Sequence, residues 1–160
     1  MISLAFTTQG KHIAEELEQL GIVASSLEGR SLHSWTEQCF QEELLVFIGA
    51  TGIAVRALAP FIKGKDSDPA VLVIDEGGRF VISLLSGHLG GANAWAEKIA
   101  AFLGATPVIT TATEGRGLFS VDRYAKEQGF AIKPLSKIKD VSMKLLEEGS
   151  IRVSGDVPLS

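Results

Sequence analysis

The run Leu44-Leu45-Val46-Phe47-Ile48 constrains the fold more than any other stretch, because it contains only apolar side chains. A strand with one face in water alternates apolar and polar residues, whereas a parallel strand covered by helices on both faces is apolar throughout. The turn 49–52 follows directly, and apolar residues at helical spacing then extend from Ile53 to Phe61. This stretch therefore predicts a strand, a turn and a helix of an α/β protein.

Strand-like and helix-like stretches alternate along most of the chain. Residues 2–6 form a short apolar run, and Ile13, Leu17 and Leu20 then fall on one face of a predicted helix. The stretches 70–74 and 79–85 flank Asp75-Glu76-Gly77-Gly78, which is typical of a β-hairpin. We therefore predict an open, Rossmann-like, mostly parallel α/β sheet with an antiparallel hairpin and helices on both faces. Further predicted elements are strands at 22–27, 107–111 and 151–153 and helices at 35–43, 92–103, 121–128 and 141–148, with Ser34 as the N-cap of the first.

Charge and cysteine content exclude several classes of protein. The 160 residues carry a net charge of −4 with scattered lysine and arginine, whereas nucleic-acid binding needs concentrated positive charge. Cys39 is the only cysteine, which excludes an internal disulfide and a cysteine-rich metal site. No apolar run approaches the ~20 residues that span a bilayer, and residues 1–6 are too short for a signal peptide. We expect a cytoplasmic protein that binds neither nucleic acid nor membrane.

The first candidate binding loop is Gly49-Ala50-Thr51-Gly52, and Arg56 follows about one helical turn later. Glycines allow a backbone to approach a ligand closely, and the N–H groups at a helix start favour an anion. The Thr51 hydroxyl can donate a hydrogen bond, and the Arg56 guanidinium can make forked contacts with a carboxylate or phosphate. The alternative is a tight turn with a solvated arginine, because the pattern is neither a Walker loop nor a dinucleotide fingerprint.

The second candidate loop, residues 86–93, contains more glycines than a strand-to-helix connection needs. His88 titrates near neutral pH and can act as a general acid or base, while Ser86 and Asn93 offer polar side chains. The alternative is that His88 caps the following helix or donates to a carbonyl oxygen. Ser86 does not lie in a G-x-S-x-G nucleophile elbow, because two leucines precede it.

Two further polar stretches lie near predicted strand ends. Thr110 and Thr111 close a predicted strand, where hydroxyls suit either a polar ligand or the formation of turns and caps. Asp66 and Asp68 precede another strand, and paired carboxylates can bind a metal or activate water. A dedicated metal site needs more ligands, so capping turns or orienting Arg56 is the simpler interpretation. The residues alone thus indicate an α/β domain with polar, glycine-rich loops suited to an anionic ligand.

Four stretches together resemble the N-terminal domain of the CbiG-type cobalamin-biosynthesis family, the cobalt-precorrin-5A hydrolases. They are 47–56, 65–71, 85–93 and 106–113, which read FIGATGIAVR, KDSDPAV, LSGHLGGAN and TPVITTAT. Several separate motifs in the same order are hard to obtain by chance. On this resemblance, residues 1–125 are the N-terminal α/β domain, and 126–160 are a linker and the start of a central region.

The resemblance implies a role in the anaerobic pathway of cobalamin (vitamin B12) synthesis. Members of the family open the δ-lactone of cobalt-precorrin-5A, release acetaldehyde and give cobalt-precorrin-5B. The tetrapyrrole substrate carries its own cobalt, so no metal site of the protein and no organic cofactor are implied. Arg56 and the two glycine loops would hold its acetate and propionate groups, while His88 assists attack of water on the lactone. The candidate residues are thus His88 for catalysis and Gly49, Thr51, Gly52, Arg56, Asp66, Asp68, Ser86, Gly87, Gly90, Gly91, Asn93, Thr110 and Thr111 for substrate binding.

Members of this family are longer than the chain and have a central region and a C-terminal domain. The implied partners are therefore those missing domains or a split subunit, together with the cobalt-precorrin and, in a homo-oligomer, a second copy. One alternative function is a non-catalytic corrinoid-binding or partner-docking module of the same pathway, and another is nucleotide binding by the glycine loops. Convergence of Arg56, Asp66, Ser86, His88 and Asn93 on one cleft would favour a ligand site, and dispersal would favour structural roles.

Overall fold

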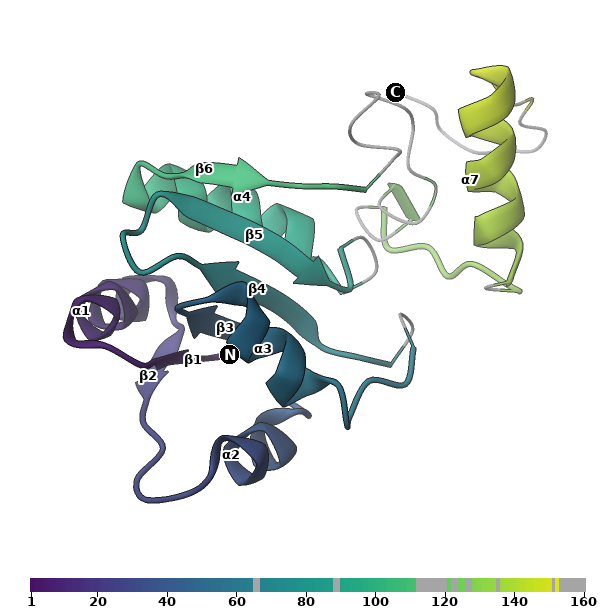
Figure 1. Ribbon diagram of the computed structural model, residues 1–160. Helices are drawn as coiled ribbons and strands as arrows, with labels where there is room; N and C mark the ends of the chain where they lie inside the picture. The colour runs from purple at the N-terminus through teal and green to yellow at the C-terminus, as the bar shows by residue number, and fades with distance from the viewer. Residues whose placement is uncertain are drawn as a thin grey trace. The chain divides into compact units, whose positions relative to one another are not determined.

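The computed structural model of the chain describes residues 1–64, 67–87, 90–111, 121, 124–125, 128–134, 136–150 and 152. The chain forms two compact units, Met1–Ile109 and Thr110–Ser160 (Figure 1). None of the helices in the described ranges is long and apolar enough to cross a membrane. The predicted limits 1–125 and 126–160 refer to the extent of the family's domain and stay a prediction.

The first unit is built on a sheet that has six strands within the described residues, in the order β2-β1-β3-β4-β5-β6. Neighbouring strands of this sheet are parallel, except that β4 and β5 form an antiparallel hairpin. Figure 1 shows the arrow of β5 running opposite to that of β4. The predicted fold class is therefore confirmed. The strands are β1 Ile2–Ala5, β2 Val23–Ser25, β3 Leu44–Ile48, β4 Ala70–Ile74, β5 Phe80–Leu85 and β6 Thr106–Val108.

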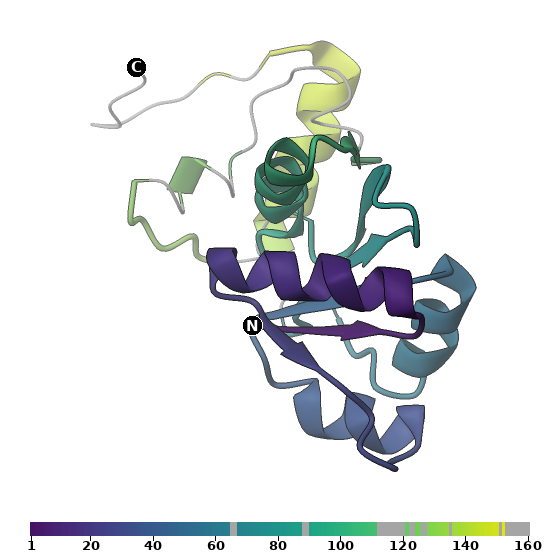
Figure 2. The ribbon, with the colours of Figure 1, turned by 90° about the vertical axis from the view of Figure 1, so that its left-hand side faces the viewer.

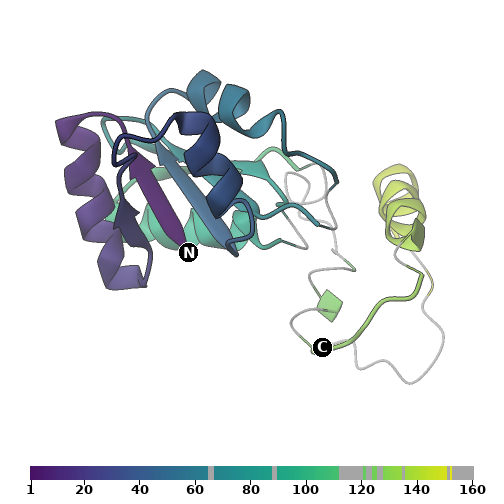
Figure 3. The ribbon, with the colours of Figure 1, turned by 90° about the horizontal axis from the view of Figure 1, so that it is seen from below.

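Helices cover both faces of this sheet. The helix α1 lies along β1 (Figure 2), and Figure 3 shows helices on either side of the strands. The helices α1 and α4 share one hydrophobic cluster with the sheet, and α2 and α3 share a second one. The helices are α1 Thr8–Leu17, α2 Leu32–Cys39, α3 Thr51–Leu58 and α4 Ala92–Leu103, with a short 3-10 helix, η1 Glu18–Leu20, after α1.

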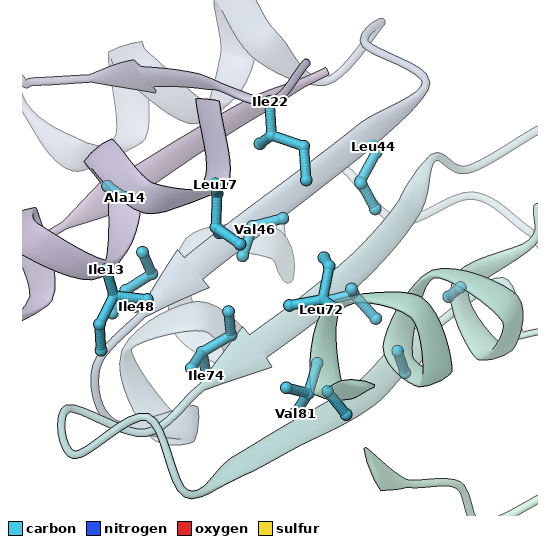
Figure 4. Packing of buried hydrophobic residues seen from close by; sticks show 14 of the residues in the cluster. Ile13, Ala14, Leu17, Ile22, Leu44, Val46, Ile48, Leu72, Ile74 and Val81 are labelled. Atoms are coloured by element: carbon cyan, nitrogen blue, oxygen red, sulfur yellow. The ribbon is translucent and has the colours of Figure 1, made fainter. Parts of the chain in front are cut away.

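The strand β3 divides its side chains between the two clusters. Leu44, Val46 and Ile48 belong to the cluster with α1 and α4, as Figure 4 shows for the α1 side. Leu45 and Phe47 belong to the cluster with α2 and α3. Because consecutive side chains of a strand point to opposite faces, a strand buried on both faces must be apolar at every position. The unbroken apolar run that predicted this strand thus has its cause in the two helical layers.

Side-chain caps fix where two of the helices begin. Thr7 Oγ1 accepts a hydrogen bond from Gly10 N at 3.1 Å at the start of α1. Ser31 Oγ accepts one from Ser34 N, also at 3.1 Å, at the start of α2. The prediction of Ser34 as this N-cap is wrong, because Ser31 starts the helix earlier by satisfying the otherwise free N–H of Ser34.

The hairpin determines which edge of the sheet each loop reaches. The strands β1, β2, β3 and β4 run in one direction, so their carboxyl ends lie at one edge of the sheet. The strands β5 and β6 run the other way, so their carboxyl ends lie at the opposite edge, near the pair Val71 and Leu85. The strand β4 from Ala70 to Ile74 separates the two edges by about 13 Å, at roughly 3.3 Å per residue.

The second unit contains the helix α7, Ser136–Glu148. Its buried side chains Ile138 and Leu145 are seven residues apart, which places both on one face of the helix. The predicted helix 141–148 is confirmed and begins earlier than expected, because Ile138 extends the same apolar face. Outside the described residues, in whole or in part, lie the predicted strand 151–153 and the predicted helix 121–128.

Candidate functional site

A hollow of about 600 Å³ lies at the carboxyl ends of β1, β3 and β4. The neighbouring strands β1 and β3 are followed by helices α1 and α3 on opposite faces of the sheet. In open α/β sheets, such a switch point leaves a crevice between the two strand ends, and ligands bind there. We call this cavity the switch-point hollow. The loop after β1 and the start of α1 line it with Phe6, Thr7 and Gln9. The turn after β3 and the start of α3 contribute Gly49, Ala50 and Ile53, and the β4–β5 turn contributes Asp75, Glu76, Gly77 and Arg79.

Gly49 brings the two loops of the switch point close together. Its φ is +153°, and a Cβ at this position would meet Phe6 Cδ2 at 3.0 Å. The helix α3 begins directly after this glycine, and no side chain caps its start at Ala50. The first N–H groups of α3 are therefore not taken by a side-chain cap beside the hollow.

The carboxylate of Asp75 holds the turn between β4 and β5. Its Oδ1 accepts hydrogen bonds from Arg79 N and Phe80 N, each at 2.7 Å, and its Oδ2 accepts one from Arg79 Nε at 3.0 Å. Gly78 N donates to the Asp75 carbonyl oxygen at 2.8 Å. The predicted hairpin thus forms because the Asp75 side chain accepts hydrogen bonds from the backbone beyond the turn. The same hydrogen bonds hold Arg79 beside the hollow.

These hydrogen bonds also set the acidity of Asp75. Burial by itself raises the pKa of the carboxyl group, but the bonds from Phe80 N, the Arg79 side chain and Arg79 N, together with the charge of Arg79, outweigh that effect. The pKa of Asp75 is therefore held below its ordinary value of 3.8. Hydrogen bonds to the charged form favour that form, so the group is a carboxylate at neutral pH.

The first predicted loop lies at the same edge of the sheet as the hollow. Gly49 lines the hollow, and Thr51 and Gly52 begin α3. Arg56 is exposed, and its Nη1 donates to the Gly52 carbonyl oxygen at 3.1 Å. Arg56 is absent from the described lining of the hollow. This geometry agrees with the solvated-arginine alternative, and ligand binding by Arg56 stays a prediction.

The second predicted loop follows β5 and therefore lies at the opposite edge of the sheet. The Ser86 hydroxyl donates to the Asp68 carbonyl oxygen at 2.9 Å. Asn93 is buried, and its Oδ1 accepts from Ser83 Oγ at 2.6 Å. These bonds tie the loop to the chain before β4 and to β5 itself. Substrate binding by Ser86 and Asn93 stays a prediction alongside these structural contacts.

Packing explains the glycines of this second loop. A Cβ at Gly90 would meet Ser86 Cβ at 2.4 Å and the Ser86 carbonyl oxygen at 2.7 Å. A Cβ at Gly87 would meet Asn93 Oδ1 at 2.8 Å. Gly91 precedes α4 with φ +82°, a left-handed conformation that favours glycine. The glycine density that suggests a ligand site thus has a steric explanation as well.

Asp68 caps a turn, as one of the alternatives from the sequence predicts. Its buried carboxylate accepts hydrogen bonds from Lys63 N at 3.0 and 3.1 Å and from Gly64 N at 3.0 Å. Backbone donors therefore surround this carboxylate at the approach to β4. A further role in substrate binding stays a prediction.

The remaining candidates are Thr110, Thr111, Asp66 and His88. Thr110 and Thr111 follow β6 and belong to the second compact unit. Asp66 and His88 lie outside the described residues, so their predicted roles stay predictions. The described candidates of unit 1 are thus dispersed over two edges of the sheet, and dispersal is the arrangement expected for structural roles.

Metal ligands and reactive thiols are scarce in the described ranges. Among these residues, no group of three or more His, Cys, Asp or Glu side chains is placed to hold a metal ion. Burial raises the pKa of the Cys39 thiol, the charge of Arg30 lowers it and that of Glu42 raises it, with a net increase. A buried thiol with a raised pKa is a poor nucleophile.

Among the described lining residues of the hollow, Gly49 is the only one that the sequence predicts as a ligand contact. Residues 75–78 are predicted only as a hairpin turn. The missing information is the strand order, because only the adjacency of β1 and β3 places these loops together. The alternation of strands and helices predicts that such a crevice exists, but it does not indicate which strands form it.

Comparison with known proteins gives matches over most of the chain. The family model described as cobalamin synthesis G N-terminal matches residues 34–114. A cobalt-precorrin-5A hydrolase of Salmonella typhimurium is 49% identical over 117 residues, which are 72% of this chain and 33% of that protein. A protein of the same name from Priestia megaterium is 43% identical over 109 residues, or 68% of this chain and 29% of that protein. The chain thus spans about a third of these relatives.

One solved structure extends the similarity to almost the whole chain. It is that of a cobalamin biosynthesis protein G homolog from Sulfolobus solfataricus, with a TM-score of 0.58 and 25% sequence identity. The match covers 98% of this chain and 50% of that one. The fold described here is therefore shared with that homolog.

Gly90→Ala is expected to destabilise the fold, because the new methyl group meets the Cβ and carbonyl oxygen of Ser86. We predict a loss of roughly 2 kcal/mol or more in the free energy of unfolding, measured by urea denaturation. Gly64→Ala is the control, because a Cβ there meets nothing within 4 Å. Equal stability of the two variants would contradict the steric explanation of this loop.

Asp75→Asn tests the hydrogen bonds of the β4–β5 turn. Because the folded-state pKa lies below 3.8, the ionised carboxylate stabilises the fold above that pH and loses this effect as the pH falls further. We expect the variant to be less stable by roughly 1 kcal/mol at pH 7, with a smaller difference at pH 3. Urea denaturation across this range measures the difference.

Asp140→Asn is the control for this series, because Asp140 is 64% exposed and pairs with Lys137 on a helix surface. Such a pair contributes little to stability. A difference between wild type and Asp75→Asn that does not change with pH would refute the assigned role of the carboxylate.

Proposed function

The chain belongs to the cobalamin synthesis G N-terminal family, and on that premise we propose that it forms the N-terminal part of a cobalt-precorrin-5A hydrolase. The relatives that carry this name match the chain over about a third of their own length. The activity of the complete enzyme is therefore proposed for an assembly that contains this chain. The missing regions belong to the same polypeptide or to a separate subunit.

The proposed reaction consumes one molecule of water and releases one molecule of acetaldehyde. Water attacks the carbonyl carbon of the δ-lactone, and the ring oxygen leaves, which yields a carboxylate and a hydroxyl group. The hydroxyl group then loses its proton, the bond between its carbon and the macrocycle breaks, and the electron pair of that bond stays on the macrocycle. The two-carbon unit departs as acetaldehyde and leaves cobalt-precorrin-5B. This chemistry needs a group that accepts the proton of the attacking water and donors that stabilise the developing oxyanion. The cobalt enters with the substrate, so no cofactor is proposed, and the reaction is assigned to the cytoplasm.

The switch-point hollow is the observation that supports substrate binding by this part. Its volume of about 600 Å³ falls within the range of roughly 300–1,000 Å³ that small-molecule sites occupy. Seven of its ten described lining residues fall within the family match, residues 34–114. We propose that the hollow takes one edge of the macrocycle, with apolar carbon on Phe6 and Ile53 and polar groups at the β4–β5 turn.

A second function is favoured by the separation of the two loops. Gly87 and Gly90 flank His88 in sequence and follow β5, so they lie at the edge opposite the hollow. If a substrate held in the hollow has its reacting bond away from this loop, His88 does not take part in the reaction. On this alternative the chain is a corrinoid-binding module, and the catalytic groups belong to the missing regions.

His88→Ala in the complete hydrolase distinguishes the two functions. If His88 is the general base, acetaldehyde release is expected to fall by about 100-fold or more. His33→Ala is the matched control, because His33 is exposed and stacks on Phe61 with ring centroids 4.9 Å apart. Unchanged acetaldehyde release in His88→Ala would show that His88 is not the general base and would favour the binding-module function.

A further inference from the structure

We propose that Arg79 binds a carboxylate of the ligand in the switch-point hollow and that Asp75 positions Arg79 for this contact. This inference rests on the proposed function only for the identity of the ligand. The class of ligand follows from the hollow itself: an organic acid whose apolar framework lies beside its carboxylate. Neither Arg79 nor Asp75 is among the candidate residues that the sequence predicts.

Three contacts hold Arg79, whose side chain is 73% exposed. Its backbone N–H and its Nε both donate to the Asp75 carboxylate, at 2.7 and 3.0 Å. Its guanidinium carbon lies 5.5 Å from the centroid of the Phe80 ring, within the range of a cation–π contact. Within the described residues, no contact uses either terminal nitrogen of Arg79. A held arginine with two unused terminal nitrogens can make the forked contact that a carboxylate accepts.

The charges around the hollow favour Arg79 as the anchor. Asp75 also lines the hollow, but its carboxylate is taken by Arg79 and by two backbone N–H groups. Glu76 is exposed, and no contact within the described residues holds its side chain. Its charge opposes an anion, and solvent screens it. Arg79 is thus the fixed cation of the described lining, and Glu76 lowers the affinity that Arg79 provides.

The other lining residues define what accompanies the carboxylate. Phe6, Ala50 and Ile53 present apolar surface, which suits carbon and not a bare inorganic anion. Thr7 Oγ1 accepts from Gly10 N, so its hydroxyl hydrogen is left for an acceptor on the ligand. Inorganic phosphate offers no carbon for the apolar surface, and we expect it to compete weakly.

The test measures binding of three compounds to the 160-residue chain and its variants. Cobyrinic acid is a corrinoid with free carboxylates, and its methyl ester is the matched corrinoid in which they are neutral. The small acid 3-phenylpropionate provides an aromatic ring and one carboxylate without a corrinoid. Absorbance titration follows the corrinoids, and amide shifts of Gly49 and Gly77 by NMR follow the small acid.

Arg79→Gln is expected to weaken binding of cobyrinic acid by roughly 10- to 100-fold, because a charged hydrogen-bond donor is lost. The affinity of Arg79→Lys should lie between those of wild type and Arg79→Gln, since a lysine cannot make the forked contact. Glu76→Gln should tighten binding by about 2- to 5-fold. Lys98→Gln is the control for net charge, because Lys98 stacks on Trp95 and does not line the hollow.

The role of Asp75 is tested by a double-mutant cycle. Asp75→Asn should weaken binding of cobyrinic acid in the wild-type background and leave it unchanged in the Arg79→Gln background. A merely structural role for Asp75 would weaken binding in both backgrounds. Circular dichroism of each variant establishes that its fold is retained.

The outcomes separate this inference from the proposed function. Loss of binding of both acids in Arg79→Gln supports the inference. Binding of 3-phenylpropionate without binding of cobyrinic acid contradicts the proposed corrinoid function and supports the carboxylate site. The inference is overturned if wild type and Arg79→Gln have equal affinity, or if cobyrinic acid and its ester bind equally well. It is also overturned if phosphate competes at similar strength, or if neither acid binds.

Discussion

The Asp75 carboxylate accepts hydrogen bonds from the backbone N–H groups of Arg79 and Phe80, and these bonds close the turn between β4 and β5. Because the turn sends β5 back along β4, β5 and β6 end at the edge of the sheet opposite to the other strands. The loop that carries Ser86 and Asn93 is thereby separated from the loop of Gly49. The same carboxylate fixes Arg79 beside the switch-point hollow. The Asp75 carboxylate thus stabilises both the turn that separates the candidate loops and the position of Arg79.

The sequence predicts the parts of this fold that local patterns control. The apolar run of β3 follows from burial on both faces, and the helix 92–103 is predicted with the bounds that α4 has. The start of α2 is missed, because Ser31 and Ser34 are equally suitable caps and only the packing of the helix selects Ser31. The composition of the hollow is missed for a different reason. Strand order is a property of long-range pairing, and no local pattern encodes it.

Glycine density proves ambiguous as a sign of ligand binding. Gly49 lies at the hollow and permits the close approach of Phe6, so close backbone packing and a ligand site coincide there. Gly87 and Gly90 are instead enclosed by Asn93 and Ser86, which accounts for them without a ligand. Motif similarity identifies the family in both places, because a family preserves structural and functional residues together. Only the geometry distinguishes the two roles, because Gly49 lines the switch-point hollow whereas Gly87 and Gly90 are packed against Asn93 and Ser86.

The proposed function requires that this chain hold the macrocycle of a cobalt-precorrin for a hydrolase of which it is one part. Anaerobic titration of the folded 160-residue chain with cobalt-precorrin-5A, followed by absorbance and by an assay for acetaldehyde, tests it most directly. We predict saturable binding with a spectral change, whether or not acetaldehyde is released. Release would place the catalytic groups in this chain, and binding alone would place them in the missing regions. A folded chain that binds no cobalt-precorrin-5A would contradict the account.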